Sequence, residues 1–232
     1  MIVDFHTHVL PGVDDGARDV ETALEMLRRS AGQGVGLMVA TPHFYASRDS
    51  VERFLERRQA AWEALRPRWT PDLPEVRLGA EVAYFPGIAR AARLDALKIE
   101  GSDALLLEMP FGAWPQSIVD EVAALAEKRR VRVILAHLER YLSTHENRRY
   151  IEQLADLPIA VQINAESLMD WRQRGKLVRM FKRGRAHLLG SDCHSLNRRP
   201  PNLGEGRDIL RRKLGGDFLE RMDRAGEALL EG

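Results

Sequence analysis

Short apolar runs alternate along the chain with longer segments whose apolar residues recur at helical spacing. Seven runs, rich in Val, Ile and Leu, predict buried strands at residues 1–5, 35–40, 75–80, 104–107, 131–136, 159–163 and 186–190. A first helix is expected to be capped by Asp15 or Asp19 and to end at Gly32 to Gly34. Further helices are predicted at residues 50–66, 86–97, 116–128, 147–156 and 167–183, and 204–230 as one broken helix or two.

Strands that alternate with helices indicate a parallel sheet, and strands made of apolar residues indicate that both faces of the sheet are buried. Seven such strands fit either an open doubly wound sheet or a closed barrel. The residues that follow the strands bear on this choice, because six of the seven strands lead directly into side chains of types that can bind metal ions. These side chains are His6, His8, His43, Glu81, Glu108, His137, Asp192 and His194.

In a parallel barrel the C-terminal ends of all strands open on one rim, where active sites are built. In an open sheet the first, third, fifth and seventh strands would lie too far apart to share one centre. The barrel is therefore favoured. Each residue alone has an ordinary alternative, since His43 could cap a helix and Glu81 could pair with an arginine. Six coincidences on one rim favour a site for divalent metal ions, for which imidazole and carboxylate are common ligands.

Composition narrows the class of protein. The chain has 232 residues, of which 44% are hydrophobic and 30% charged, which suits one domain over residues 1–232. A formal net charge of +1 gives no general field for nucleic acid or an anionic membrane. A signal-peptide pattern and a membrane-length apolar run are both missing, and a single cysteine suits a reducing compartment. We therefore expect a cytoplasmic protein that is not inserted in a membrane.

The motifs at the strand ends resemble those of the polymerase-and-histidinol-phosphatase (PHP) superfamily, and among its members the capsule-operon tyrosine phosphatases of bacteria. The resembling stretches are DFHTHVLPGVDDGA at residues 4–17, ATPH at 40–43, EMP at 108–110, HLERY at 137–141 and SDCH at 191–194. The resemblance implies a distorted seven-stranded (β/α) barrel that holds three divalent ions, often manganese. It further implies hydrolysis of phosphotyrosine in the autophosphorylated tail of a bacterial tyrosine kinase that controls capsule or exopolysaccharide synthesis.

The same resemblance implies a ligand set. The first ion would be bound by His6, His8, Glu81 and Asp192, the second by Glu81, Glu108 and His137, and the third by Asp14, His43 and His194. Mixed imidazole and carboxylate ligands suit manganese, iron or zinc. Four converging carboxylates would also repel one another without bound cations. Phe44 and Leu138 depart from the pattern of close relatives, but neither is a predicted ligand.

Two arginines are predicted to bind the phosphate and to stabilise the transition state. Arg140 follows His137 by three residues, and Arg199 follows the last predicted ligand. A planar guanidinium suits a dianionic phosphate because it donates two parallel hydrogen bonds. The alternative for Arg199 is a solvated surface position, since the chain is rich in arginine.

Other features have weaker interpretations. Residues 193–199 match the Cys-x5-Arg signature of cysteine-dependent phosphatases, but no glycine lies between Cys193 and Arg199, so the match is attributed to chance. His187 is expected to be a hydrogen-bonded structural residue. Phe111 and Trp114 either pack in the core or form a wall for an aromatic ring. The basic segment 171–185 is a solvated helix face or attracts an acidic peptide.

Three rival functions remain open from the sequence. A small-molecule phosphatase of the same superfamily, such as a histidinol phosphatase, would use the same cluster. A phosphodiesterase or exonuclease is disfavoured by the neutral net charge and by the lack of a basic groove with interleaved aromatic residues. A non-catalytic binding module is disfavoured by the apparently complete ligand set.

Overall fold

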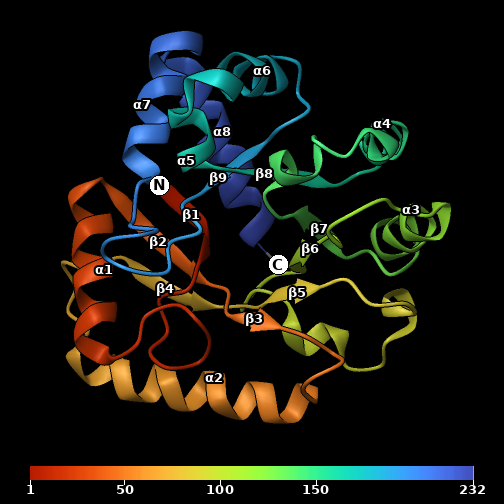
Figure 1. Cartoon of the computed structure of the whole chain (residues 1–232). Coiled ribbons are helices and arrows are strands. Elements are labelled where there is room, and N and C mark those ends of the chain that lie inside the picture. Colours follow the sequence, from red (N-terminus) through yellow and green to blue (C-terminus); the bar gives the residue numbers. More distant parts are fainter. Residues whose placement is uncertain (232) are drawn as a thin grey trace.

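A computed structural model describes residues 1–231 of the protein and shows a curled parallel sheet surrounded by helices (Figure 1). Its strands are β1 (Ile2–Thr7), β2 (Val35–Ala40), β3 (His43–Phe44), β4 (Glu75–Leu78), β5 (Glu81–Ala83), β6 (Ala104–Glu108), β7 (Arg132–Leu135), β8 (Ala160–Asn164) and β9 (Leu188–Gly190). All the strand pairs are parallel. The predicted α/β class and parallel sheet are confirmed.

The strands form two hydrogen-bonded sets, ordered β1-β2-β4 and β3-β5-β6-β7-β8-β9. Residues 41–42 separate β2 from β3, and residues 79–80 separate β4 from β5, so a further short strand follows each of the predicted strands 35–40 and 75–80. β9 is followed by a parallel bridge between Thr7 and Cys193, which brings the last strand beside the first. The count of seven strands in one closed barrel stays a prediction.

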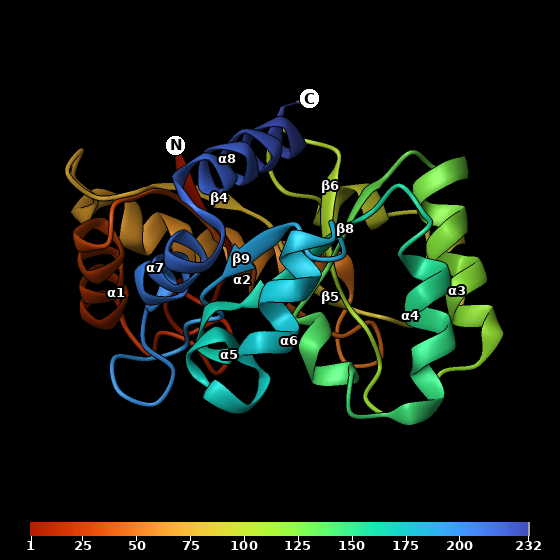
Figure 2. The ribbon, with the colours of Figure 1, turned by 90° about the horizontal axis from the view of Figure 1, so that it is seen from above.

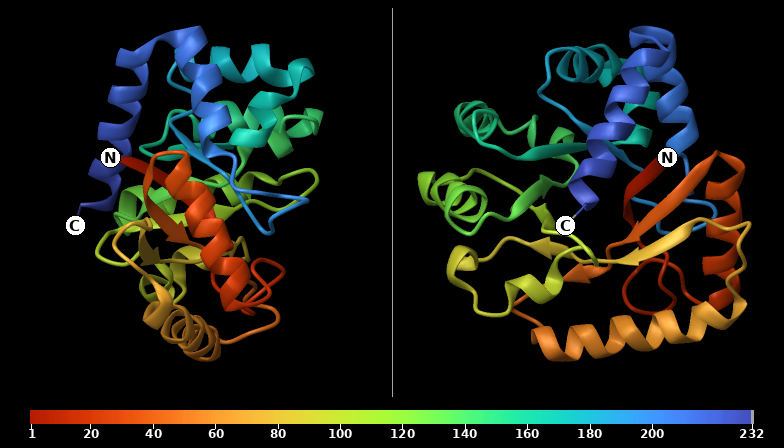
Figure 3. Two further views of the ribbon diagram at one scale, coloured as in Figure 1. Left: turned by 90° about the vertical axis from the view of Figure 1, so that its left-hand side faces the viewer. Right: turned by 180° about the vertical axis from the view of Figure 1, so that it is seen from behind.

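The longer helices cover the outside of the sheet (Figures 1 and 3). They are α1 (Val20–Gly32), α2 (Val51–Leu65), α3 (Gln116–Ala123), α4 (Arg148–Leu154), α5 (Ala165–Met169), α6 (Trp171–Lys182), α7 (Leu203–Leu214) and α8 (Gly216–Leu230). Asp19 caps α1 by accepting a hydrogen bond from the Thr22 N–H. Gly215 separates α7 from α8 with a left-handed φ of 91°, so the predicted break in the last helix is confirmed.

Two predicted helices differ from the structure. The helix predicted at residues 86–97 is wrong: only short 3₁₀ turns, η2 (Ile88–Arg90) and η3 (Leu94–Leu97), form there. Gly87 adopts a left-handed φ of 86°, which an α-helix does not accommodate. The helix predicted at 167–183 is divided into α5 and α6 because Asp170 is extended and caps α6. The remaining short elements are η1 (Arg66–Arg68), the π-helical η4 (Ala124–Lys128), η5 (Leu138–Tyr141) and η6 (His145–Asn147).

The core has an outer and an inner part. The inner cluster lies within the curl of the sheet and includes Phe5, Leu37, Leu106 and Leu188. Helix α8 covers it at the end where the strands begin: Leu230 joins the inner cluster, and the Leu230 carbonyl accepts a hydrogen bond from the Arg77 guanidinium (Figure 2). Because α8 closes this end, the open end of the sheet is the opposite one, where the strands finish and the polar side chains that follow them lie. Among residues 1–231, no helix has the length and apolar character that a membrane crossing requires.

Candidate metal centre

The side chains predicted as ligands converge at the C-terminal ends of the strands. They come from β1 and the residue after it (His6, His8), the first residues of β3 and β5 (His43, Glu81), the end of β6 (Glu108) and the segments after β7 and β9 (His137, Asp192, His194). All of them are buried except His43, whose side chain is 18% exposed. Burial of so many ionisable groups at one place requires compensating charge.

Four of these side chains lie close together. The Nε2 atoms of His6 and His8 are 3.1 Å apart, as expected for side chains on the same face of a strand. Glu81 Oε2 lies 3.2 Å and 3.4 Å from these nitrogens, and Asp192 Oδ1 lies 3.3 Å and 3.5 Å from them. Neither oxygen accepts a well-aligned hydrogen bond among the described residues, although His43 Nδ1 lies 2.8 Å from Glu81 Oε2.

This spacing fits a divalent ion. Ligand atoms arranged tetrahedrally at about 2.0–2.2 Å from an ion lie about 3.3–3.6 Å from one another. The five separations of 3.1–3.5 Å, from the two histidines to each other and to the two carboxylates, therefore fit ligands of one centre. The two oxygens without a well-aligned hydrogen bond are the acceptors that such an ion would satisfy.

A second group of ligands includes the other oxygen of Glu81. Glu81 Oε1 lies 2.8 Å from His137 Nε2, which is 3.6 Å from Glu108 Oε1. Although burial acts to raise it, the neighbouring His6, His137 and His43 hold the pKa of Glu81 well below its usual range. Burial and the nearby Glu81 carboxylate raise the pKa of Glu108 to about 7. A bound cation would relieve this repulsion, so the second group also fits a metal ion.

The third group contains Asp15 in place of the predicted Asp14. Asp15 Oδ1 lies 3.5 Å from His43 Nε2 and 3.5 Å from His194 Nε2, and these three side chains together with His8 form one group with metal-binding spacing. Asp15 is 70% exposed, whereas the two histidines are largely buried. Asp15 therefore stands at the mouth of the site.

Asp14 has a different role from the one predicted. Its carboxylate accepts hydrogen bonds from His8 Nδ1 at 2.7 Å, from the His43 N–H at 2.9 Å and from the Gly16 N–H at 3.0 Å. Burial opposes ionisation, but the His8 contact keeps the pKa of Asp14 below its usual range. Asp14 thereby orients the His8 ring, as carboxylates behind metal-binding histidines commonly do.

Both predicted arginines reach the site. Arg140 Nη2 donates to Asp192 Oδ2 at 2.6 Å, and the Arg199 guanidinium also contacts that oxygen. Arg199 Nη1 lies 3.0 Å from His194 Nε2. The side chains of Arg140 and Arg199 are 35% and 31% exposed, and both are held at the site by their contacts with Asp192. Their positions suit contact with an anion at the mouth.

Two polar residues of β8 support the ligands and were missed as site residues from the sequence. The Gln162 amide accepts a hydrogen bond from the His137 N–H at 2.8 Å and donates to Asn164 Oδ1 at 2.8 Å. Asn164 Nδ2 donates to Asp192 Oδ2 at 2.8 Å. Gly190 on β9 makes room for this chain, because a Cβ there would lie 2.7 Å from Gln162 Nε2. The sign of this role in the sequence was a glutamine within an otherwise apolar predicted strand.

Aromatic side chains border the mouth on two sides. Phe111 is 65% exposed and its ring stacks 6.4 Å from that of His137. Trp114 is buried against Tyr141 and so does not form part of a wall. On the other side Tyr45 stacks on His43 at 5.4 Å and lines a cavity of about 430 Å³ shared with Asp15. An aromatic substrate would meet Phe111 and Tyr45.

The remaining sequence features have structural roles. Cys193 is fully buried, and burial raises the pKa of its thiol, which is the opposite of what a nucleophile needs. His187 Nδ1 accepts a hydrogen bond from the Val161 N–H at 3.0 Å, which confirms the prediction of a hydrogen-bonded structural residue.

Known proteins match this chain over nearly its whole length. A family model described as capsular polysaccharide synthesis, CpsB/CapC, matches residues 2–229. The tyrosine-protein phosphatase YwqE of Bacillus subtilis is 26% identical over 99% of this chain and 91% of its own length. The tyrosine-protein phosphatase CpsB of Streptococcus pneumoniae is 26% identical over 92% of this chain and 91% of its own length.

A further relative and a solved structure extend these comparisons. The putative tyrosine-protein phosphatase CapC of Staphylococcus aureus is 27% identical over 86% of this chain and 79% of its own length. A solved structure, from a study of YwqE and CpsB as metal-dependent tyrosine phosphatases, aligns with a TM-score of 0.86 at 24% identity, over 99% of this chain and 94% of that one. The structural likeness establishes the shared fold.

Proposed function

Because the chain belongs to the CpsB/CapC family of capsular polysaccharide synthesis proteins, we propose that it is a metal-dependent phosphatase that hydrolyses phosphotyrosine in protein. The observation that carries the proposal is the set of four atoms from His6, His8, Glu81 and Asp192, spaced as ligands of one ion. The relatives named as tyrosine-protein phosphatases supply the substrate class.

The ligand assignment includes one change from the sequence-based set. The first ion is assigned to His6, His8, Glu81 and Asp192, the second to Glu81, Glu108 and His137, and the third to Asp15, His43 and His194. The donor set of imidazole and carboxylate suits manganese first, with iron or zinc as alternatives. Divalent ions held there would polarise the phosphate oxygens and supply an activated water near neutral pH.

The protein's own residues bind and orient the substrate. Arg140 and Arg199 approach the site from η5 and from the segment after β9, and both hold Asp192 Oδ2 while leaving part of each guanidinium at the mouth. A phosphate there would accept hydrogen bonds from these guanidinium groups, which stabilise the charge that develops in the transition state. Phe111 would contact the tyrosine ring.

Four broader inferences accompany this function. The interrupted strands β2/β3 and β4/β5 each count as one unit of a distorted seven-stranded (β/α) barrel, closed by the Thr7–Cys193 bridge. Residues 1–232 form one phosphatase domain. The substrate is the autophosphorylated tail of a bacterial tyrosine kinase that controls capsule or exopolysaccharide synthesis. The protein acts in the cytoplasm, where such a tail is exposed.

Metal analysis combined with phosphatase assays tests the proposal. We expect the purified protein to contain divalent ions, to lose activity on a phosphotyrosine peptide when treated with a chelator, and to regain it with Mn²⁺. Cys193→Ser is the matched control and should retain most of the activity. A protein that is active without metal, or that loses activity through Cys193→Ser, would contradict the proposal. Faster hydrolysis of histidinol phosphate than of the peptide would favour the small-molecule alternative.

Phe111 provides a test of substrate class. Phe111→Ala is expected to raise KM for a phosphotyrosine peptide about tenfold, because an aromatic contact is worth about 0.5–1.5 kcal/mol beyond the area it buries. Hydrolysis of an aliphatic phosphate monoester should change little. Initial rates on the two substrates measure the difference. Equal losses on both would mean that Phe111 supports the site and does not recognise the ring.

A further inference from the structure

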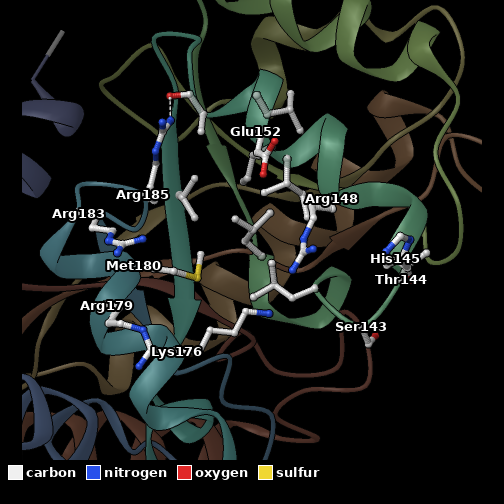
Figure 4. Close-up of a pocket in the computed structure, with 17 residues that line it drawn as sticks. Ser143, Thr144, His145, Arg148, Glu152, Lys176, Arg179, Met180, Arg183 and Arg185 are labelled. Carbon is white, nitrogen blue, oxygen red and sulfur yellow. Dashed lines mark hydrogen bonds between the residues drawn. The ribbon is translucent and has the colours of Figure 1, made fainter.

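A cavity of about 780 Å³ lies between α4 and α6, separate from the metal centre (Figure 4). Its floor is apolar and includes Leu135 of β7 and Val161 of β8, whose side chains belong to the outer core. Leu142, Ile151 and Met180 also line it and are only partly buried. An apolar hollow of this size that is open to solvent is typical of a binding site.

Positive charge surrounds this floor. Arg148 projects from α4, and Lys176 and Arg179 of α6 lie at helical spacing with Arg183, the residue directly after that helix. In Figure 4 the Arg148 and Lys176 side chains point toward each other across the hollow. Within residues 1–231 none of these four cations forms an ion pair. Repulsion among them would be relieved by a bound anion.

Two further charged groups line the cavity. Arg185 is already paired, since its Nη1 lies 3.4 Å from an Asp156 carboxylate oxygen. Glu152 is the one acidic residue in the lining, on the α4 wall. The balance of charge is therefore strongly positive, and an apolar floor beneath it suits a ligand with both carboxylate or phosphate groups and apolar side chains.

The cavity and the metal centre share a wall. The short helix η5 carries Leu138 and is followed by Leu142, and both side chains line the cavity. Between them Arg140 reaches the other way and donates to Asp192 at 2.6 Å. A chain that occupies the cavity and crosses η5 would therefore enter the mouth of the metal centre.

We propose that this cavity is an exosite for an acidic peptide segment, with interspersed apolar or aromatic residues, that belongs to the same protein as the phosphotyrosine being hydrolysed. The inference rests on the proposed function for its choice of ligand. The apolar floor takes the aromatic or aliphatic side chains, and the four cations pair with carboxylates or with a second phosphotyrosine. A peptide fits better than a lipid surface, because the cations lie on two facing walls of a hollow and do not form one outward plane.

A binding experiment tests the exosite without requiring turnover. The probe is a fluorescein-labelled peptide in which Glu and Phe alternate and which carries no phosphotyrosine; fluorescence anisotropy measures its Kd. Lys176→Glu/Arg179→Glu should weaken binding about tenfold, and Arg148→Glu on the opposite wall should act in the same direction. The matched control is Arg212→Glu/Lys213→Glu, which makes the same charge change at exposed positions of α7 and should leave the Kd within about twofold.

Kinetics then connect the cavity to catalysis. Lys176→Glu/Arg179→Glu should raise KM about tenfold for a phosphotyrosine peptide extended by the acidic segment, and should leave turnover of 4-nitrophenyl phosphate unchanged. Equal effects of the cavity and α7 variants would overturn the exosite, as would binding to phosphatidylglycerol vesicles without binding to the peptide. If no phosphate ester is hydrolysed, the proposed function fails, while the anisotropy measurement still decides whether the cavity binds acidic peptide.

Discussion

Glu81→Gln is expected to lower kcat/KM on a phosphotyrosine peptide by about 10³-fold or more, since metal-ion stabilisation is worth several kcal/mol and each 1.36 kcal/mol is about tenfold in rate. Glu81 Oε2 lies among the first group of ligands, and Oε1 lies 2.8 Å from His137 in the second. Removing its charge should release the ions of both groups and leave the third, at Asp15 and His194, in place. Metal content by mass spectrometry and initial rates measure the two effects.

Glu127→Gln is the matched control, because Glu127 is exposed on η4 and is not part of the site. It should change neither metal content nor rate. Asp15→Asn gives the complementary result: loss of the third ion with the first two retained. If Glu81→Gln keeps its full complement of ions, the bridging role is wrong. If Asp14→Asn rather than Asp15→Asn releases the third ion, the assignment returns to the one expected from the sequence.

The sequence predicted the site best where strand position alone determines geometry. His6, His43, Glu81 and His137 lie at the ends of apolar runs, and the C-terminal ends of parallel strands meet at one rim whatever the details of the loops. The choice between Asp14 and Asp15 depended on the path of one loop. Hydrogen bonds to Asp14 from the His8 ring and from two backbone N–H groups fix that path, and none of them is visible as a pattern in the sequence.

Residues that act through other residues were harder to find. Gln162 and Asn164 support His137 and Asp192 through hydrogen bonds between residues far apart in the sequence, so their role follows only from the assembled sheet. The cavity between α4 and α6 could not be predicted from the sequence either. The basic character of residues 171–185 was evident, but whether those side chains meet solvent or a hollow depends on how α6 sits relative to α4.

Arg140→Ala is expected to lower kcat by about 10²–10³-fold, the usual cost of removing one donor that stabilises transition-state charge. Its contact with Asp192 allows a second explanation, in which Arg140 only neutralises a ligand. The two explanations differ in their consequences: loss of a phosphate donor lowers kcat with metal content unchanged, whereas loss of a neutralising partner changes the retention of metal. Metal analysis beside the kinetics therefore separates them.

Arg140→Lys sharpens the distinction, because lysine keeps the charge but lacks the planar pair of donors. If the guanidinium binds phosphate in a bidentate manner, Arg140→Lys should recover only a small part of the lost kcat. If charge next to Asp192 is all that matters, it should restore nearly full activity. Arg212→Ala on α7 controls for the loss of an exposed arginine. A full recovery by lysine would remove Arg140 from phosphate recognition and leave Arg199 as the guanidinium at the mouth able to bind the substrate.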